Sequence, residues 1–228
     1  MIFMATNTVV GNLVCSDGTN IPLKAEIAEG TEADLTTDAV YTVSAQNIGD
    51  YAPGKVLVAG SIQADNGISY AYVLSQGLVA SIIPVSVKGV SQEVPMLCAP
   101  YQLKAGDKIR VLTLTAAARN AALCVYTAQG VSRIFVATPS GAGTEQLLDL
   151  QTNNAIGDTL QGQTIVKGFG SSIDGSKIET MGAYVVDALG NVVGAVPLSD
   201  PADNAPIFSM SYNIPVALNF KAQYLLNA

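Results

Sequence analysis

The residues that could carry chemistry are few and widely scattered along the chain. No histidine occurs among the 228 residues, which removes the commonest general base and metal ligand, and with it any Ser-His-Asp or Cys-His catalytic arrangement. The sequence also contains no G-x-S-x-G or S-x-x-K nucleophile motif and no complete glycine-rich phosphate loop. We therefore expect a protein that is not an enzyme and that carries no cofactor.

One short segment offers oxygen ligands for a hard cation. Asp200, Asp203 and Asn204 bring three oxygen-bearing side chains into five residues, and Ca²⁺ prefers such ligands. Pro201 and Pro206 favour a different interpretation, a stiff surface loop without metal. Both interpretations stay open at the level of sequence.

The three cysteines do not form a metal-binding pattern. Cys15, Cys98 and Cys124 are widely spaced and include no C-x-x-C pair, so a zinc or iron–sulfur site is unsupported. Each lies among apolar neighbours, which is typical of a small buried side chain. The alternative is one disulfide with a spare thiol.

The scarcity of charge is the most informative feature of the composition. Charged residues make up 13% of the chain and hydrophobic residues 49%, against roughly 25% charged in an ordinary soluble domain. The net charge of −7 argues against direct binding to nucleic acid, and no apolar run is long enough for a membrane-spanning helix. A surface so poor in lysine and glutamate resembles a large subunit interface. The chain is therefore expected to form homo-oligomers.

Two sets of residues are candidates for such an interface. The first set is the three arginines of the chain, because a planar guanidinium suits ion pairs between subunits. They are Arg110, Arg119 and Arg133. Near the C-terminus, apolar and polar residues alternate over residues 216–224, as in a strand with one buried face. Its apolar candidates are Val216, Leu218, Phe220 and Tyr224.

The elements that would position these residues are strands. Period-2 alternation and Gly, Asn and Asp turn signals recur along the chain, as in sandwiches and barrels. The expected strands cover residues 8–15, 40–45, 55–62, 69–74, 78–87, 108–115, 122–127, 132–138, 164–169, 177–186, 192–197 and 216–224. Short helices are alternatives at residues 31–35 and 144–150. The predicted fold is all-β, an antiparallel sandwich or jelly-roll-like barrel.

No linker divides the chain, so residues 1–228 are predicted to form a single β domain, with residues 1–8 as an N-terminal arm. Three stretches share an order of glycine, strand, Tyr-Val or Val-Tyr, glycine turn, proline and serine: residues 54–86, 106–140 and 162–199. One interpretation is a three-stranded meander repeated three times. The other is an ordinary β-meander in which Gly and Pro stand where turns need them.

The Met4-Ala5-Thr6-Asn7 start, the β pattern rich in Ala, Thr, Val and Gly, and the Ala105-Gly106-Asp107-Lys108 turn resemble coat proteins of non-enveloped viruses, especially phage shell and decoration (cement) proteins. The resemblance implies a sandwich or jelly-roll core and many copies in an icosahedral lattice. It also implies contacts with other virion proteins, in trimers, pentamers or hexamers, and location in the virion after assembly in the host cytoplasm. The chain lacks a basic arm, which favours an outer layer or a cement protein.

Two other classes remain. A carbohydrate- or ligand-binding β module would need exposed aromatic side chains, for which the candidates are Tyr41, Tyr51, Tyr70, Tyr72 and Tyr101. A cellular surface-array or filament subunit shares the composition but normally carries a secretion signal, and no signal peptide is recognisable at this N-terminus.

Overall fold

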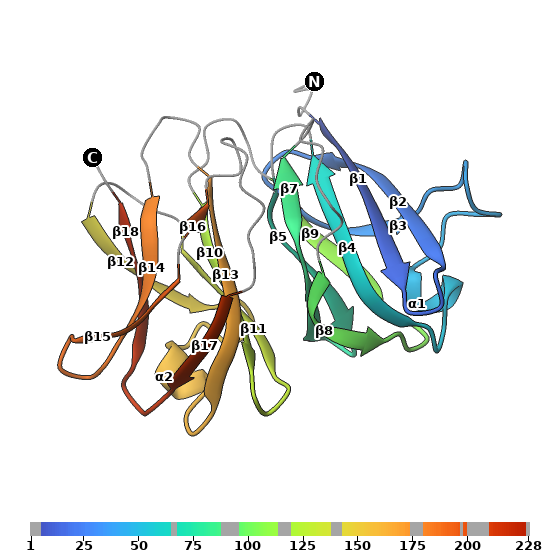
Figure 1. Ribbon diagram of the computed structural model, residues 1–228. Coiled ribbons are helices and arrows are strands. Elements are labelled where there is room, and N and C mark those ends of the chain that lie inside the picture. The colour runs from blue at the N-terminus through green and yellow to red at the C-terminus, as the bar shows by residue number, and fades with distance from the viewer. Residues whose placement is uncertain are drawn as a thin grey trace. The chain divides into compact units, whose positions relative to one another are not determined.

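The computed structural model describes residues 6–64, 68–87, 96–113, 120–137, 143–173, 180–196, 198–199 and 210–226 (Figure 1). Most of these residues lie in strands, and nearly all of the described strand pairs are antiparallel, which confirms the predicted all-β class. The chain folds into two compact units, Met1–Ala116 and Ala117–Ala228, called unit 1 and unit 2 below. This differs from the single domain predicted over residues 1–228. The sequence did not reveal the division because it falls in a segment that does not have the composition of a linker.

Unit 1 is built on a nine-stranded sheet, drawn in blue to green in Figure 1. Its elements are β1 (Thr6–Cys15), β2 (Asn20–Ala28), β3 (Glu32–Thr37), α1 (Ile48–Tyr51), β4 (Val56–Ala64), β5 (Ile68–Ser75), β6 (Leu78–Ile83), β7 (Val85–Val87), β8 (Met96–Gln102) and β9 (Lys108–Thr113). The strand order is β6-β5-β9-β3-β2-β1-β4-β7, with β8 paired to β4. Only the β4–β7 pair is parallel among the described pairs of this unit.

Unit 2 repeats this plan strand by strand. Its elements are β10 (Asn120–Thr127), β11 (Ser132–Ala137), β12 (Gly143–Asp149), α2 (Ile156–Thr159), β13 (Thr164–Ile173), β14 (Thr180–Val186), β15 (Val192–Val196), β16 (Leu198–Ser199), β17 (Met210–Pro215) and β18 (Lys221–Leu226). The order β15-β14-β18-β12-β11-β10-β13-β16, with β17 paired to β13, is the order of unit 1 with each strand replaced by its counterpart nine places later. The parallel pair recurs as β13–β16.

The repeat extends to single backbone hydrogen bonds. The Gly54 amide donates to Leu103 in unit 1, and the Gly162 amide donates to Val216 in unit 2, at 2.8 and 2.9 Å. Both glycines adopt positive φ, 80° and 76°, a conformation that glycine adopts without a steric penalty. The two units are therefore the same fold built twice from one chain.

The short helices α1 and α2 share the sequence Ile-Gly-Asp and the same packing. Ile48 and Ile156 are each fully buried. A Cβ on Gly49 would collide with the carbonyl oxygen of Lys104, and a Cβ on Gly157 with the amide nitrogen of Phe220. Glycine is needed at both positions because the helix lies directly against the backbone that leads into the last strand of its unit.

Each unit has its own hydrophobic core, formed by the inward side of alternating strand residues. In unit 1 the core includes Leu13, Leu35 and Ile109. In unit 2 the corresponding cluster includes Val125, Leu147 and Phe135. Alternation in the sequence agrees with the buried faces of strands such as β1 and β9.

Several local predictions were wrong. The segments predicted as possible helices, 31–35 and 144–150, lie mainly in β3 and β12. Residues 40–45 form a bent loop, not a strand. Pro84 divides residues 78–87 into β6 and β7, and the segment 216–224 begins with a turn before β18 starts at Lys221.

The threefold repeat is replaced by a twofold one. Residues 54–86 and 162–199 occupy equivalent places, from the turn before β4 or β13 to β7 or β16. The middle stretch, 106–140, runs from the end of unit 1 into the first strands of unit 2 and matches neither. Its glycines Gly106 and Gly130 lie in turns, in agreement with the alternative interpretation for that part of the stretch.

Candidate functional site

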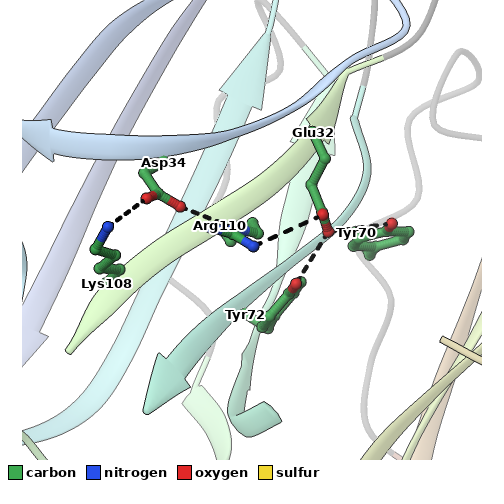
Figure 2. Close-up of polar contacts among 6 residues, drawn as sticks. All are labelled: Glu32, Asp34, Tyr70, Tyr72, Lys108 and Arg110. Carbon is green, nitrogen blue, oxygen red and sulfur yellow. Dashed lines mark hydrogen bonds and ion pairs between the residues drawn. The ribbon is translucent and has the colours of Figure 1, made fainter. Parts of the chain in front are cut away.

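The densest group of polar side chains crosses three neighbouring strands of unit 1. On β3, β5 and β9 the odd-numbered residues Leu35, Val73 and Ile109 point into the core. Since successive strand residues point to opposite sides, even-numbered residues share the other face. This face carries the polar cluster, which consists of Glu32, Asp34, Tyr70, Tyr72, Lys108 and Arg110 (Figure 2).

Asp34 is the centre of the polar cluster. It lies directly across from Arg110 in the β3–β9 register. Its Oδ1 accepts a hydrogen bond from Nε of Arg110 at 2.8 Å, and its Oδ2 accepts one from Nζ of Lys108 at 3.0 Å. Burial raises the pKa of the Asp34 carboxyl, but the hydrogen bonds from Arg110 and Lys108 outweigh it, so the pKa lies below its ordinary value.

Glu32 extends the cluster to β5. Its Oε1 accepts hydrogen bonds from the hydroxyls of Tyr72 at 2.9 Å and Tyr70 at 3.4 Å, and Nη1 of Arg110 lies 4.0 Å from its Oε2 (Figure 2). Burial, then the hydrogen bond to Glu32, raises the pKa of the Tyr72 hydroxyl. The hydrogen bond to Asp34 raises the pKa of Arg110. All three strands are thus joined by side chains held in their charged or hydrogen-bonding forms.

This arrangement consists of ion pairs and hydrogen bonds between neighbouring strands. The Asp34 carboxylate is paired with Arg110 and Lys108, and its pKa lies below the ordinary value, so it is not poised as a general base, which needs a pKa near the working pH. The Glu32 carboxylate accepts hydrogen bonds from two tyrosine hydroxyls. The predicted interface residue Arg110 is engaged within its own unit by Asp34. The polar cluster links β3, β9 and β5 through their side chains.

Unit 2 keeps the strands but not the ion pairs of this cluster, although Lys221 stands in the position of Lys108. The β12–β18 and β14–β18 registers place Gln146, Gln223 and Tyr184 where unit 1 has Asp34, Arg110 and Tyr72. Thr144 stands in the position of Glu32. The fold therefore does not require the ion pairs, and they distinguish unit 1 from unit 2.

Unit 2 contains a different buried pair, Arg133 and Asp149. The Asp149 side chain is 1% exposed, and Nε of Arg133 lies 3.7 Å from its Oδ2. Its Oδ1 accepts hydrogen bonds from the amides of Gln151 and Thr152 and from the Thr152 hydroxyl. Arg133, predicted at an interface, instead faces a buried carboxylate that closes the β12–α2 turn.

The other predicted interface residues divide between core and surface. Val216 is 4% exposed, and Phe220 packs against the core of unit 2. Leu218 is 50% exposed. Tyr224 lies on β18, which pairs with β12 and β14 of the same unit. Arg119 lies outside the described residues.

The predicted cation ligands Asp200, Asp203 and Asn204 also lie outside the described residues. Within the part of the chain that the structure describes, no group of three or more His, Cys, Asp or Glu residues is placed to hold a metal ion. Cys15 and Cys124 are both buried, as expected for small apolar side chains. Burial raises the pKa of the Cys15 thiol, with a smaller contribution from Asp17.

The tyrosines do not form an aromatic platform for a sugar. Tyr70 and Tyr72 are each 4% exposed, and the Tyr101 hydroxyl donates to Asp107 at 2.8 Å. Tyr51 packs against the core of unit 1. Among the five candidates Tyr41 is the exposed one, at 76%.

Sequence reasoning missed an ordered apolar loop. The loop between β3 and α1 holds Val40, Tyr41 and Val43 at 80, 76 and 101% exposure. The carbonyl oxygen of Asp38 accepts hydrogen bonds from the amides of Tyr41 and Thr42. The apolar run in the sequence predicted a strand here. The signal for a loop was Asp38, because an aspartate side chain often accepts a hydrogen bond from a backbone amide two residues on, as Oδ1 of Asp38 does from Val40.

Comparison of the chain with protein-family models, with curated proteins and with solved structures found no match. Among the described residues, α1 and α2 are each a single four-residue turn, and no helix there could cross a membrane.

Proposed function

We propose that this chain is a non-catalytic structural protein of a virion, which self-assembles into a capsid shell or decorates one. Its partners are further copies of itself and other virion proteins. The role follows from the surface chemistry of the two units and from the resemblance to coat and cement proteins.

One observation supports the proposal most strongly: the distribution of apolar and charged side chains. Large apolar side chains are exposed on loops, hairpins and an edge strand, in both units: Val40, Tyr41, Val43, Leu78, Leu189, Val192, Val193 and Leu218. The charges in the polar cluster of unit 1 are paired within that unit. Association that covers exposed apolar area is favourable by roughly 25 cal/mol per Å², and few charges need to be desolvated for it.

The test is the assembly state of the purified full-length chain. Light scattering and negative-stain microscopy across a concentration series should show rings, capsomers or shells as the concentration rises. A monomer at every concentration would contradict self-assembly. The same series with a glycan array would separate a coat protein from a sugar-binding module, because only the latter should bind glycans.

A further inference from the structure

The strand β15 forms one end of the strand order of unit 2. It pairs with β14, and no other described strand pairs with it. Its exposed residues and those of the preceding turn, called the β15 edge below, are Leu189, Val192, Val193 and Ala195. Leu189, Val192 and Val193 are 87, 59 and 42% exposed, and Ala195 is also exposed.

The equivalent strand of unit 1 is covered. The registers β5–β6 and β14–β15 match Val79 with Val192 and Ile82 with Ala195. Val79 and Ile82 are 5 and 3% exposed. Two strands with the same place in the same fold therefore differ in exposure, and the open one is β15.

The β15 edge has none of the lysine, proline or inward charges by which many monomeric proteins block an exposed strand, although β15 is short and contains a bulge. Residues 188–196 contain no charged residue. The nearest carboxylate, Asp187, accepts hydrogen bonds from the Leu189 and Asn191 amides and from the Asn191 side chain. Those hydrogen bonds, the Asn191 side chain first, hold the Asp187 pKa below its ordinary value.

We propose that β15 pairs antiparallel with β15 of a second copy of this chain, around a twofold axis near Gly194. This names a contact through which the assembly of the proposed function proceeds, and it rests on that function. In a twofold contact the same patch faces itself, so a charge near the axis would lie close to the like charge of the second copy. The uncharged β15 edge meets its own copy without that repulsion, and the small side chain of Ala195 lets two backbones approach.

The contact is expected to be short. Val193 is the extra residue of a bulge opposite Val185 and Val186, and bulges interrupt regular pairing. A contact of one short strand buries less than the roughly 800 Å² per partner of a standard interface. Association through the β15 edge should therefore be weak in solution and gain strength only where many copies act together.

The experiment compares the full-length chain with Val193→Lys and with the matched control Val10→Lys. Val10 and Val193 are both 42% exposed, but Val10 lies on β1, between β2 and β4. Sedimentation from about 1 µM to about 1 mM should show the midpoint for association of Val193→Lys raised at least tenfold, about 1.4 kcal/mol. Val10→Lys should stay within about twofold of the unsubstituted chain. Circular dichroism melts establish that both variants fold.

A second measurement needs no variant. Amide hydrogen exchange at residues 192–196 of the unsubstituted chain should slow as its concentration rises, because pairing protects edge amides. Equal association of both lysine variants, or exchange of β15 amides that is independent of concentration in an associating chain, would overturn the β15 contact and leave self-assembly intact. A chain that stays monomeric throughout would instead contradict the proposed self-assembly, and the β15 contact with it.

Discussion

At the scale of single residues, the pair Asp34 and Arg110 shows how two units of one fold diverge. Both side chains are less than one-third exposed, at 24 and 31%, so their pairing is screened by water less than that of a fully exposed pair. Unit 2 places Gln146 and Gln223 at the equivalent positions. One chain thus contains a charged pair of residues in unit 1 and a neutral pair in unit 2 at the same cross-strand position.

This divergence gives the first prediction. Asp34→Gln or Arg110→Gln alone should lower the free energy of unfolding of unit 1 by about 1 to 2 kcal/mol. Each removes the 2.8 Å ion pair and leaves a partly buried charge with its second partner alone, Lys108 for Asp34 and the more distant Glu32 for Arg110. The double variant should lose less than the sum of the two, since it installs the pair found in unit 2. Urea unfolding measures all three. Asp158→Asn, at an exposed carboxylate of α2, controls for net charge, and strictly additive losses would contradict the coupling.

The lowered pKa of Asp34 predicts how acid affects stability. Because the folded pKa lies below the ordinary value of 3.8, the ion pair stabilises the fold fully above about pH 4. That stability is lost as the pH falls through the folded pKa. Asp34→Asn should therefore show a smaller drop in urea midpoint between about pH 7 and about pH 3 than the unsubstituted chain. An equal drop in both would assign the acid sensitivity to other carboxylates, such as Asp17.

At the scale of elements, strand alternation made much of the fold predictable. β1, β4 and β9 are rich in Val, Ile and Leu and have turn residues at their ends, and the sequence located all three. It missed β2, where Pro22 and charged residues obscure the period, and it suggested helices at β3 and β12 because acidic residues at their starts resemble a helix N-terminus. The polar cluster could not be found, because the three strands that form it are distant in the sequence.

Because α2 packs closely against the turn before β18, a methyl group added at Gly157 should lower the stability of unit 2 strongly. Gly157→Ala should destabilise unit 2 by several kcal/mol, because its Cβ would overlap the backbone at Phe220. Gly162→Ala is the matched control: its φ of +76° makes alanine unfavourable, but nothing lies within 4 Å of the added Cβ, so the loss should be about 1 kcal/mol. Thermal unfolding of both variants checks this, and equal losses would show that packing at Gly157 is not tight.

The position of β18 predicts what a truncation does. A chain ending at Asn219 lacks β18, which pairs with both β12 and β14, so unit 2 should not fold. A chain ending at Leu226 keeps the whole strand and should fold normally. Two-dimensional NMR spectra of the two chains distinguish the cases. Dispersed unit 2 signals in the shorter chain would mean that β18 is dispensable.

At the scale of the whole molecule, the sequence did not reveal the division into two units, because the motifs that recur along the chain suggested a different repeat length. Glycine, proline and Tyr-Val motifs recur in both units at matching places, such as Gly54 and Gly162, and the sequence showed them as a repeat. A third stretch with similar turns made the period seem shorter than it is. The true period became evident only from the order of strands, because strand pairing is specified by contacts between distant residues.

The net charge of −7 predicts how salt acts on the proposed assembly. Copies of an acidic chain repel one another at long range, and raising ionic strength from about 0.05 M to about 0.5 M shortens the Debye length to a few ångströms. The β15 edge contains no ion pair for salt to weaken, so the concentration needed for association should fall as salt rises. Light scattering at fixed pH over this salt series measures it. Association that weakens with added salt would mean that opposite charges, not the apolar β15 edge, hold the copies together.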